Sequence, residues 1–475
     1  MTTKRLTVPI VGARAVDRAL MVNNQRSINW RPEVEGDGAK STLTLKPTPG
    51  MIRKLRAGNG PARSRGVVFK GAAYFVSGRN LVKVDTAWNA TIIGTLNTGS
   101  GFCSIVAGRN YILVVDGGDG YTWDGTSFAT VTDGDFPAAP QVCGYLDGFY
   151  IVNTASSDAW NISANEDPTS WAALDFSRAD AAPDDAVGIV TTYRDVYLVG
   201  SYTTQVYYNS GNAQFPFDQY ANGVLEFGTP APFTIARAGG VIFMLAQHDE
   251  SGLTVLAVNG FQAQRITDPD LADFLSQMDP TTVSQAYAYA YTEADQTFYV
   301  LTFPGDDITF VYHMEQKMWH EWSSNGMGRH RSLGYVRFNN CHLVGDSIDN
   351  RVYALDSRTY TDDGEMITRK RIGTVMARDG RDFTVDSFEI ELGRGTALLS
   401  GQGSDPQLMF RYSDNGGLRW SRRSLLSLGT RGDGSRRAIL NKLGQMSAFT
   451  PEISITDPVE AIVIAAYAEV DLLDA

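Results

Sequence analysis

A strand-turn-strand unit recurs along most of this chain, and it constrains the possible fold more than any other feature. Each unit has a turn, an aromatic-rich strand, a Gly or Asp corner and a second strand, as in KGAAYFVSGRNLVKV at residues 70–84. The strand centres are Tyr74, Tyr111, Tyr150, Tyr197, Phe243, Tyr299 and His342. They lie 37 to 56 residues apart. A period of roughly 40–50 residues with several strands per unit is typical of β-propeller blades. The repeat therefore predicts an all-β propeller of about seven blades, and a row of β-sandwich domains is the alternative.

The repeat also divides the chain into three parts. It occupies residues 61–378, which we expect to form the propeller body. Residues 379–475 contain five further strand-like segments and predict a C-terminal β module, with a ring-closing sheet as the alternative. Residues 1–60 hold Pro9, Pro32, Pro47 and Pro49 with little strand alternation. They are expected to form an extended N-terminal arm that either faces a partner or closes the ring.

Charge is strongly segregated along these parts. The whole chain carries 41 Lys and Arg against 53 Asp and Glu, a net charge of −12. Residues 1–66 carry a net +9, residues 67–363 carry −20, residues 364–442 carry +5 and the last 33 residues carry −6. General nucleic-acid binders have a basic surplus, so the balance argues against that class. Most of these charges are expected to be solvated surface, whereas an extended basic arm could lie along an acidic neighbour.

The cysteines and the apolar runs indicate the cellular compartment in which such a chain is made. Three widely spaced cysteines, Cys103, Cys143 and Cys341, include no CxxC pair and offer no disulfide framework. They fit assembly in a reducing compartment. The N-terminus has no continuous apolar stretch of a signal peptide, and no run reaches the ~18 apolar residues of a membrane span.

Catalytic and metal-binding signatures are missing from the sequence. It contains no GxxxxGK[ST], HExxH or GxSxG motif. His313 and His320, the latter within a WHEW segment, lie seven residues apart, a spacing unsuited to one metal, so a packing role is expected. Glu321 and Asp346 could pair in principle, but nothing in the sequence places them together. The run DGGDGYTWDG at residues 116–125 lacks the terminal Glu of a calcium loop, and hairpin turns explain it better. We therefore expect no catalytic residue, no metal and no cofactor.

One local motif, SDNGGLRW at residues 413–420, resembles the Asp-box of sialidase-type propellers. Asn415 replaces the usual Asp. The expected structure is a β-hairpin corner in which Ser413 and Asn415 bond the turn backbone, Gly417 takes a left-handed conformation and Trp420 packs beneath. The box is structural in the families that carry it, so it favours a hairpin and says little about glycan cleavage.

Several longer stretches, taken in order, resemble the podophage tail-hub or nozzle proteins, which are also called packaged-DNA stabilisation proteins. They are NNQRSINWRPE (23–33), LKPTPG (45–50), EDPTSWAALDFSRADAAPD (166–184), TTQVYYNSGNAQFPF (203–217), FPGDDITFVYHMEQKMWHEW (303–322), RYSDNGGLRWS (411–421) and ITDPVEA (455–461). Together they extend the resemblance over nearly the whole chain. Asn415 and the shortened segment after Gly432 depart from the family pattern and affect only C-terminal details.

The resemblance implies a structural virion protein of a short-tailed bacteriophage, without enzymatic activity or cofactor. It implies a homohexameric hub in the virion tail, made in the host cytoplasm, which lies below the portal-adaptor connector, extends the DNA channel and helps retain packaged DNA. Tailspikes or fibres and a tail needle or plug would attach to it, and DNA would pass through the lumen without sequence-specific binding. No membrane insertion of its own is implied. Arg14, Arg18, Arg26 and Arg31 are expected either to contact the connector or to form ion pairs within the fold.

The acidic body gains a possible purpose in this setting, because an acid-lined channel repels phosphates and lets DNA slide. Acids that merely keep the hub soluble before assembly are the alternative. Two other functions also stay open. One is a carbohydrate-active propeller, sialidase-like or a depolymerase, which would need Arg, Tyr and Asp or Glu clustered at the ring centre. The other is a generic propeller scaffold that binds short peptides.

Overall fold

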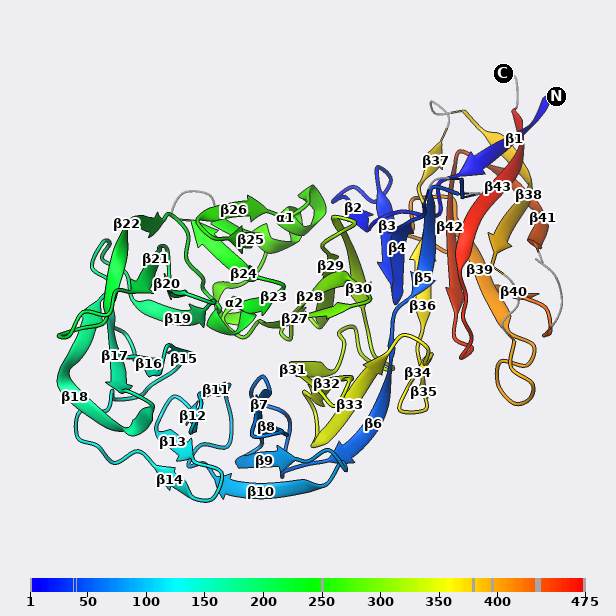
Figure 1. Cartoon of the computed structure of the whole chain (residues 1–475). Helices are drawn as coiled ribbons and strands as arrows, with labels where there is room; N and C mark the ends of the chain where they lie inside the picture. The colour runs from blue at the N-terminus through cyan, green and yellow to red at the C-terminus, as the bar shows by residue number, and fades with distance from the viewer. Residues whose placement is uncertain are drawn as a thin grey trace.

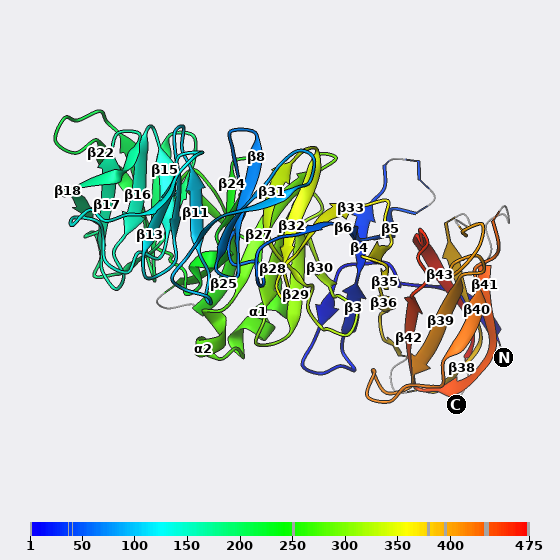
Figure 2. The same ribbon diagram turned by 90° about the horizontal axis from the view of Figure 1, so that it is seen from below.

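The structure is a computed structural model that describes residues 2–36, 38–39, 41–248, 252–377, 381–393, 397–431 and 437–472. Strands in these residues form two bodies, a ring of sheets and a second, smaller β domain beside it (Figures 1 and 2). The helical segments of the described residues are short: η1 (Pro232–Thr234), α1 (Pro269–Ser276) and α2 (Pro280–Val283). Asp268 caps α1 by accepting a hydrogen bond from the Leu271 backbone N–H at 2.8 Å. The predicted all-β propeller with a C-terminal β module is confirmed.

Seven blades surround one axis in the described part of the chain, and each has four strands in antiparallel order (Figure 1). Blade 1 contains β7 (Val67–Phe69), β8 (Ala72–Ser77), β9 (Asn80–Val84) and β10 (Ala90–Thr95), and blade 2 contains β11 (Ser104–Ala107), β12 (Ile112–Val115), β13 (Gly120–Trp123) and β14 (Phe128–Thr130). Blade 3 contains β15 (Cys143–Leu146), β16 (Phe149–Asn153), β17 (Ala159–Ala164) and β18 (Asp167–Arg178), and blade 4 contains β19 (Ala186–Thr191), β20 (Asp195–Gly200), β21 (Thr204–Asn209) and β22 (Phe217–Leu225). Blade 5 contains β23 (Ala236–Ala238), β24 (Val241–His248), β25 (Gly252–Asn259) and β26 (Gln262–Arg265). Blade 6 contains β27 (Tyr287–Glu293), β28 (Gln296–Phe303), β29 (Ile308–His313) and β30 (Met318–Trp322). Blade 7 contains β31 (Ser332–Phe338), β32 (Cys341–Asp346), β33 (Arg351–Asp356) and β6 (Gly50–Arg56). The strand centres predicted from the repeat lie in, or directly before, the second strand of each blade.

Apolar clusters fill the space between neighbouring blades. Seven such clusters exist among the described residues, one for each pair of adjacent blades around the ring. Between blades 5 and 6, for example, the ring of Phe243 stacks on that of Tyr299 with centroids 5.2 Å apart. Because each blade buries its two faces only against its neighbours, the blades depend on a closed ring for stability.

The ring is closed by a strand from the N-terminal part of the chain. β6 pairs antiparallel with β33, with Arg56 opposite Arg351 and Gly50 opposite Asp356. Blade 7 thus combines three strands from the end of the repeat with one strand that precedes the first blade. This connection ties the two ends of the propeller together.

The rest of residues 1–60 does not form the separate arm that the sequence predicted, because its strands are part of larger sheets. β1 (Thr2–Val8) pairs along its length with β43 (Val463–Leu472), and β4 (Trp30–Val34) pairs with β5 (Leu43–Pro47) in the same sheet. The prolines obscured these strands in the sequence. Pro32 is tolerated because β4 lies at the edge of its sheet, where a missing N–H breaks no ladder.

The C-terminal domain is a sandwich of two sheets that share one apolar core. One sheet has the order β4-β5-β43-β38-β41, with β38 at Phe383–Leu392 and β41 at Arg437–Met446. The other contains β3 (Asn24–Ile28), β36 (Arg369–Ile372), β42 (Ala448–Ile455), β39 (Gln407–Ser413) and β40 (Ser424–Ser427). Trp30 is fully buried in this core, and its ring N–H donates to the Ala461 carbonyl at 2.9 Å.

The second sandwich sheet is continuous with the propeller. β3 pairs parallel with β30 of blade 6, at Ile28 opposite Glu321, and antiparallel with β36 on its other side. Figure 1 shows β3 and β36 between the two bodies, with both chain ends at the far end of the sandwich. The N-terminal segment therefore joins the domains edge to edge.

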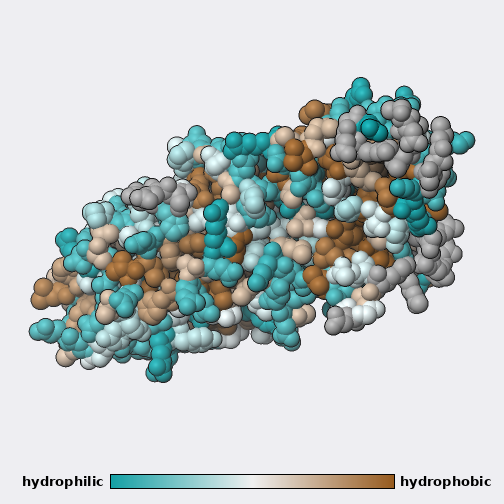
Figure 3. All heavy atoms as spheres, turned by 90° about the horizontal axis from the view of Figure 1, so that it is seen from above, coloured by the Kyte–Doolittle hydropathy of each residue, from teal (hydrophilic) through white to brown (hydrophobic). Residues whose placement is uncertain are grey.

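On the face of the molecule drawn in Figure 3, apolar residues form separate patches among hydrophilic ones. No helix in the described residues is long and apolar enough to cross a membrane.

Candidate functional site

The centre of the propeller is closed by aromatic rings from three different elements. Phe102, next to blade 2, lies 4.7 Å from Phe233 in η1 and 5.7 Å from Tyr287 of blade 6, measured between ring centroids. These rings meet across the axis and form what we call the aromatic plug. A DNA duplex therefore has no path through the propeller of a single chain.

Two cavities that share the lining residues Arg65, Ile235 and Ala288 lie on the axis beside the plug. A smaller one of about 40 Å³ borders Phe102, Phe233 and Tyr287. The larger one, of about 120 Å³, is called the axial cavity below, and its lining is Arg65, Ile235, Ala236, Arg237, Ala288, Tyr289, Ala290 and Tyr335. None of the described residues that line either cavity is Asp or Glu. The Arg and Tyr side chains of a glycan-cleaving centre are present, but the acids of glycoside hydrolysis are missing from these linings.

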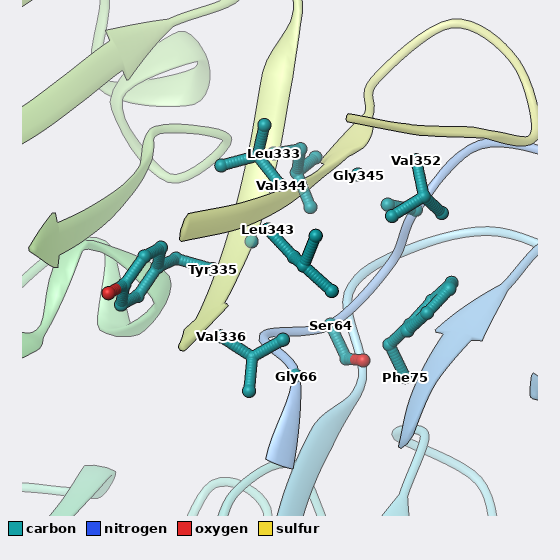
Figure 4. A pocket seen from close by; sticks show the side chains of 12 residues that line it. Ser64, Gly66, Phe75, Leu333, Tyr335, Val336, Leu343, Val344, Gly345 and Val352 are labelled. Atoms are coloured by element: carbon teal, nitrogen blue, oxygen red, sulfur yellow. The ribbon is translucent and has the colours of Figure 1, made fainter. Parts of the chain in front are cut away.

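A third hollow, drawn in Figure 4, lies where blade 7 meets blade 1. Its volume is about 10 Å³, and apolar side chains such as Phe75, Val336 and Leu343 surround it. A space of this size holds one water molecule at most. It is a packing void at the ring closure rather than a binding site.

The junction between the two domains contains a buried cluster of opposite charges. Arg14 donates to Glu321 at 2.8 Å and also contacts Asp270, and Arg26 makes a two-pronged contact with Glu321. The side chains of Glu321 and Arg14 are only 3% and 8% exposed. Burial opposes the ionisation of Glu321, but the guanidinium groups of Arg26 and Arg14 outweigh it and keep its pKa below the usual value.

A second arginine fixes the N-terminal segment at this junction. Arg371 on β36 is fully buried and donates to the carbonyls of Ile10 and Ala13 at 2.6 and 3.0 Å and to the Gln25 side chain at 2.6 Å. Burial lowers the pKa of Arg371 to about 9. These bonds hold the segment from Ile10 to Gln25 between the two domains.

The four arginines predicted to face a connector therefore lie in different settings. Arg14 and Arg26 belong to the junction cluster described above. Arg31 lies 3.5 Å from Glu33 and over the Phe298 ring at 5.3 Å. Arg18 contacts Asp273, but 68% of its side chain is exposed. Each of the four has a carboxylate partner within the fold, and Arg18 is the most exposed of them.

The SDNGGLRW segment forms the corner between β39 and β40. The Ser413 hydroxyl accepts from the backbone N–H of Asn415 and Gly417 at 3.2 and 2.8 Å, and the Asn415 side chain accepts from the Arg419 N–H at 2.8 Å. Gly417 has φ +99°. The Arg411 guanidinium lies over the Trp420 ring at 4.7 Å. This hairpin is in the sandwich, and its corner packs on the N-terminal segment through Asn24, whose amide donates to the Gly416 carbonyl at 3.0 Å.

The histidines and the aspartate-rich run take structural roles in the described residues. His313 and His320 are buried in blade 6, and burial lowers the pKa of His313 to about 4. In the 116–125 run, the carboxylates of Asp116 and Asp124 accept backbone N–H bonds of their own turns. The described residues include no group of three or more His, Cys, Asp or Glu that could hold a metal ion.

Glu321 and Asp346 lie in separate clusters. Asp346 pairs with Arg331 at 2.6 Å and accepts from the Tyr353 hydroxyl at 3.0 Å within blade 7. The role of Glu321 at the junction was not found from the sequence, although one signal exists. A Glu flanked by WH and W in a buried strand must have a cationic partner.

Comparisons with known proteins were made over the whole chain. A family model described as bacteriophage P22 Gp10, β-propeller, matches residues 8–360, and a second described as bacteriophage P22 Gp10, β-sandwich, matches residues 368–471. A search of curated protein sequences found no match.

Among solved structures, BamB from Moraxella catarrhalis is 10% identical with a TM-score of 0.40, and the match covers 70% of this chain and 97% of BamB. Virginiamycin B lyase from Staphylococcus aureus is 9% identical with a TM-score of 0.44, and the match covers 64% and 97% of the two chains. Likenesses at this level carry no argument about function.

Proposed function

The chain belongs to the family of bacteriophage P22 Gp10 and is a phage tail hub protein, and from this premise we propose that six copies form a ring below the portal-adaptor connector. The ring extends the DNA channel of the virion tail and helps retain packaged DNA. The observation that carries this proposal is that both domains match the family, over residues 8–360 and 368–471. The hub is built in the host cytoplasm and acts as a structural protein rather than an enzyme.

In this proposal the DNA lies on the axis of the ring, outside the individual propellers. The aromatic plug supports this arrangement, because it fills the axis of each propeller. Residues 67–363 carry a net charge of −20, so six copies bring −120 to the ring. Acidic walls would repel the phosphates and let the duplex slide, whereas lysines would release counterions and hold it.

We place the connector-facing surface at the segment that leads into β3. Arg18 is the exposed cation there, with 68% of its side chain exposed to solvent. Arg14, Arg26 and Arg31 would act by holding this segment in place through their partners Glu321 and Glu33. Tailspikes or fibres and the needle or plug would bind other faces of the ring.

Electron microscopy of the purified chain with the dodecameric adaptor of its phage tests the proposal. The expected result is a six-fold ring at the distal end of the adaptor. An Arg18→Glu variant should bind the adaptor more weakly, while Arg358→Glu, with a side chain 92% exposed on the propeller, serves as the charge-matched control. A chain that remains monomeric beside intact adaptor would contradict the proposal.

A further inference from the structure

The axial cavity contains positively charged side chains that have no role in the function proposed above. Residues of blades 5, 6 and 7 and the segment before blade 1 line it, and its two charged side chains are Arg65, before blade 1, and Arg237 on blade 5. Its volume is about 120 Å³, several times what one water molecule needs.

Arg65 makes no hydrogen bond or salt bridge with any of the described residues. Its side chain is exposed to solvent in the cavity, and desolvation by the protein packed around it lowers the pKa of its guanidinium. The nearest titratable group is the thiol of Cys143, which stays neutral because burial raises its pKa to about 12. Arg65 therefore has no counter-charge from the protein.

Arg63, two residues earlier, differs from Arg65 in that its guanidinium has hydrogen-bond partners in the protein. Arg63 is buried and donates to the carbonyls of Gly78, Thr98 and Gly101, among others. Its guanidinium holds neighbouring turns together and has few donors left. Arg63 is a structural arginine, whereas the five donors of Arg65 are all available.

Arg237 is only partly used. One of its terminal nitrogens donates to the Thr191 carbonyl at 2.9 Å, and its guanidinium lies 4.8 Å from the centre of the Tyr193 ring. Neither contact supplies a negative charge. The remaining donors of Arg237 are free to bind a ligand in the cavity.

The other polar side chains of the lining already have partners. The Tyr289 hydroxyl bonds with Ser332 at 2.8 Å, and the Tyr335 hydroxyl bonds with His342 at 2.9 Å. Tyr335 also points away from the packing void in Figure 4. The unused hydrogen-bonding capacity of the cavity is thus that of two cations, with no carboxylate among the lining residues.

We propose that the axial cavity is a binding site for one compact oxyanion, held between Arg65 and Arg237. Guanidinium groups donate two parallel hydrogen bonds to phosphate or carboxylate oxygens, which fits a small anion of either kind. Binding would supply the counter-charge that Arg65 lacks.

Isothermal titration calorimetry of the full chain, in low-salt buffer free of phosphate and sulfate, tests the site. Inorganic phosphate should bind with a stoichiometry of one per chain, and sodium acetate is titrated separately. Arg65→Gln and Arg237→Gln should each weaken binding at least about tenfold. Arg109→Gln, which changes a propeller arginine whose side chain is 80% exposed, should leave binding unchanged.

The outcomes separate the two ligand chemistries from failure of the proposal. Phosphate binding without acetate binding identifies a tetrahedral oxyanion, and binding of both extends the site to carboxylates. Arg65→Lys keeps a charge in the cavity and should retain part of the affinity, which guards against a variant that merely misfolds. The proposal is wrong if neither anion shows saturable binding, or if Arg65→Gln binds phosphate as tightly as the natural chain with an unchanged circular dichroism spectrum.

Discussion

Glu321 is the residue on which the junction between the two domains depends most. Its carboxylate receives both Arg14 and Arg26, and it is almost fully buried together with Arg14. The change Glu321→Gln keeps the shape but removes the negative charge that Arg14 and Arg26 share, and it leaves the buried Arg14 with Asp270 as its charged partner. Breaking a buried ion pair costs about 3 kcal/mol or more. We expect the free energy of unfolding to fall by about that amount, measured by urea denaturation.

An exposed ion pair gives the matched control for this variant. Asp414 lies 3.3 Å from Arg419, and their side chains are 45% and 78% exposed. Asp414→Asn should cost less than about 1 kcal/mol. Equal losses from the two variants would contradict a special role for Glu321.

Asp362 gives the protein a pH-dependent stability. It is 4% exposed, accepts from the Ser324 hydroxyl at 3.4 Å, and burial raises its pKa to about 7. Because the folded state binds this proton more tightly than the unfolded state, its contribution to stability is complete below about pH 4 and is lost as the pH rises to 7. The natural chain should therefore lose about 2 kcal/mol more than Asp362→Asn between pH 5 and pH 8.

Urea denaturation of both proteins at the two pH values measures this difference. Asp363→Asn changes the adjacent, half-buried carboxylate and should keep the pH response of the natural chain. Parallel pH profiles for the natural chain and Asp362→Asn would show that Asp362 does not titrate in this range.

At the scale of elements, the strands and turns that the sequence predicts correctly are those with a local sequence pattern. The second strand of each blade combines aromatic and β-branched residues with Gly or Asp corners, so period and turn chemistry both mark it. The hairpin at residues 413–420 carries an equally local signal. All these elements form where the sequence indicates them.

Elements that pair over long distances could not be found in this way. β6 is separated from its partner β33 by about 300 residues, and β1 pairs with the last strand of the chain. Arg14 finds its partners at Asp270 and Glu321. No local pattern encodes such pairings, so residues 1–60 resembled a separate arm, and the sequence left open whether their arginines contact a connector or form ion pairs within the fold.

The hairpin corner at Gly417 links the sandwich to the N-terminal segment, and a substitution there tests this link. Gly417 has φ +99°, and an added Cβ would lie 2.2 Å from the amide nitrogen of Asn24. Gly417→Ala should cost about 1–2 kcal/mol for the left-handed backbone and further stability for displacing Asn24. Gly401→Ala, with φ +77° and nothing within 4 Å of the added Cβ, should show only the backbone cost. Thermal unfolding measures both, and equal shifts would mean that the contact with Asn24 contributes nothing.

At the scale of the whole molecule, the propeller is a solid body rather than a tube. The aromatic plug fills its axis, and clusters between adjacent blades fill the ring. The sandwich is joined to blade 6 by a continuous sheet and by the buried charges of the junction. A hub made from such units can enclose DNA only between copies. The charge on the outer faces of the propeller therefore determines whether the hub binds or repels the DNA.

This arrangement predicts that the assembled hub does not bind duplex DNA. Non-specific DNA-binding proteins reach dissociation constants of about 10⁻⁴–10⁻⁶ M through phosphate contacts with Lys and Arg. The propeller repeat has a net charge of −20 and should repel the phosphates. Fluorescence anisotropy with a labelled duplex should therefore show no binding at about 10 μM hub, even at about 50 mM salt.

A charge-reversed variant shows whether the acids, rather than the shape of the ring, exclude DNA. Asp185, Asp218 and Asp306 are exposed on the propeller, and none of their carboxylates has a hydrogen bond or ion pair within the described residues. Changing all three to Lys raises the charge of each chain by six, and the variant hub should gain binding that weakens steeply with added salt. Salt-sensitive binding by the natural hub would contradict the sliding channel, because it would mean that basic side chains, and not the acidic propellers, face the DNA.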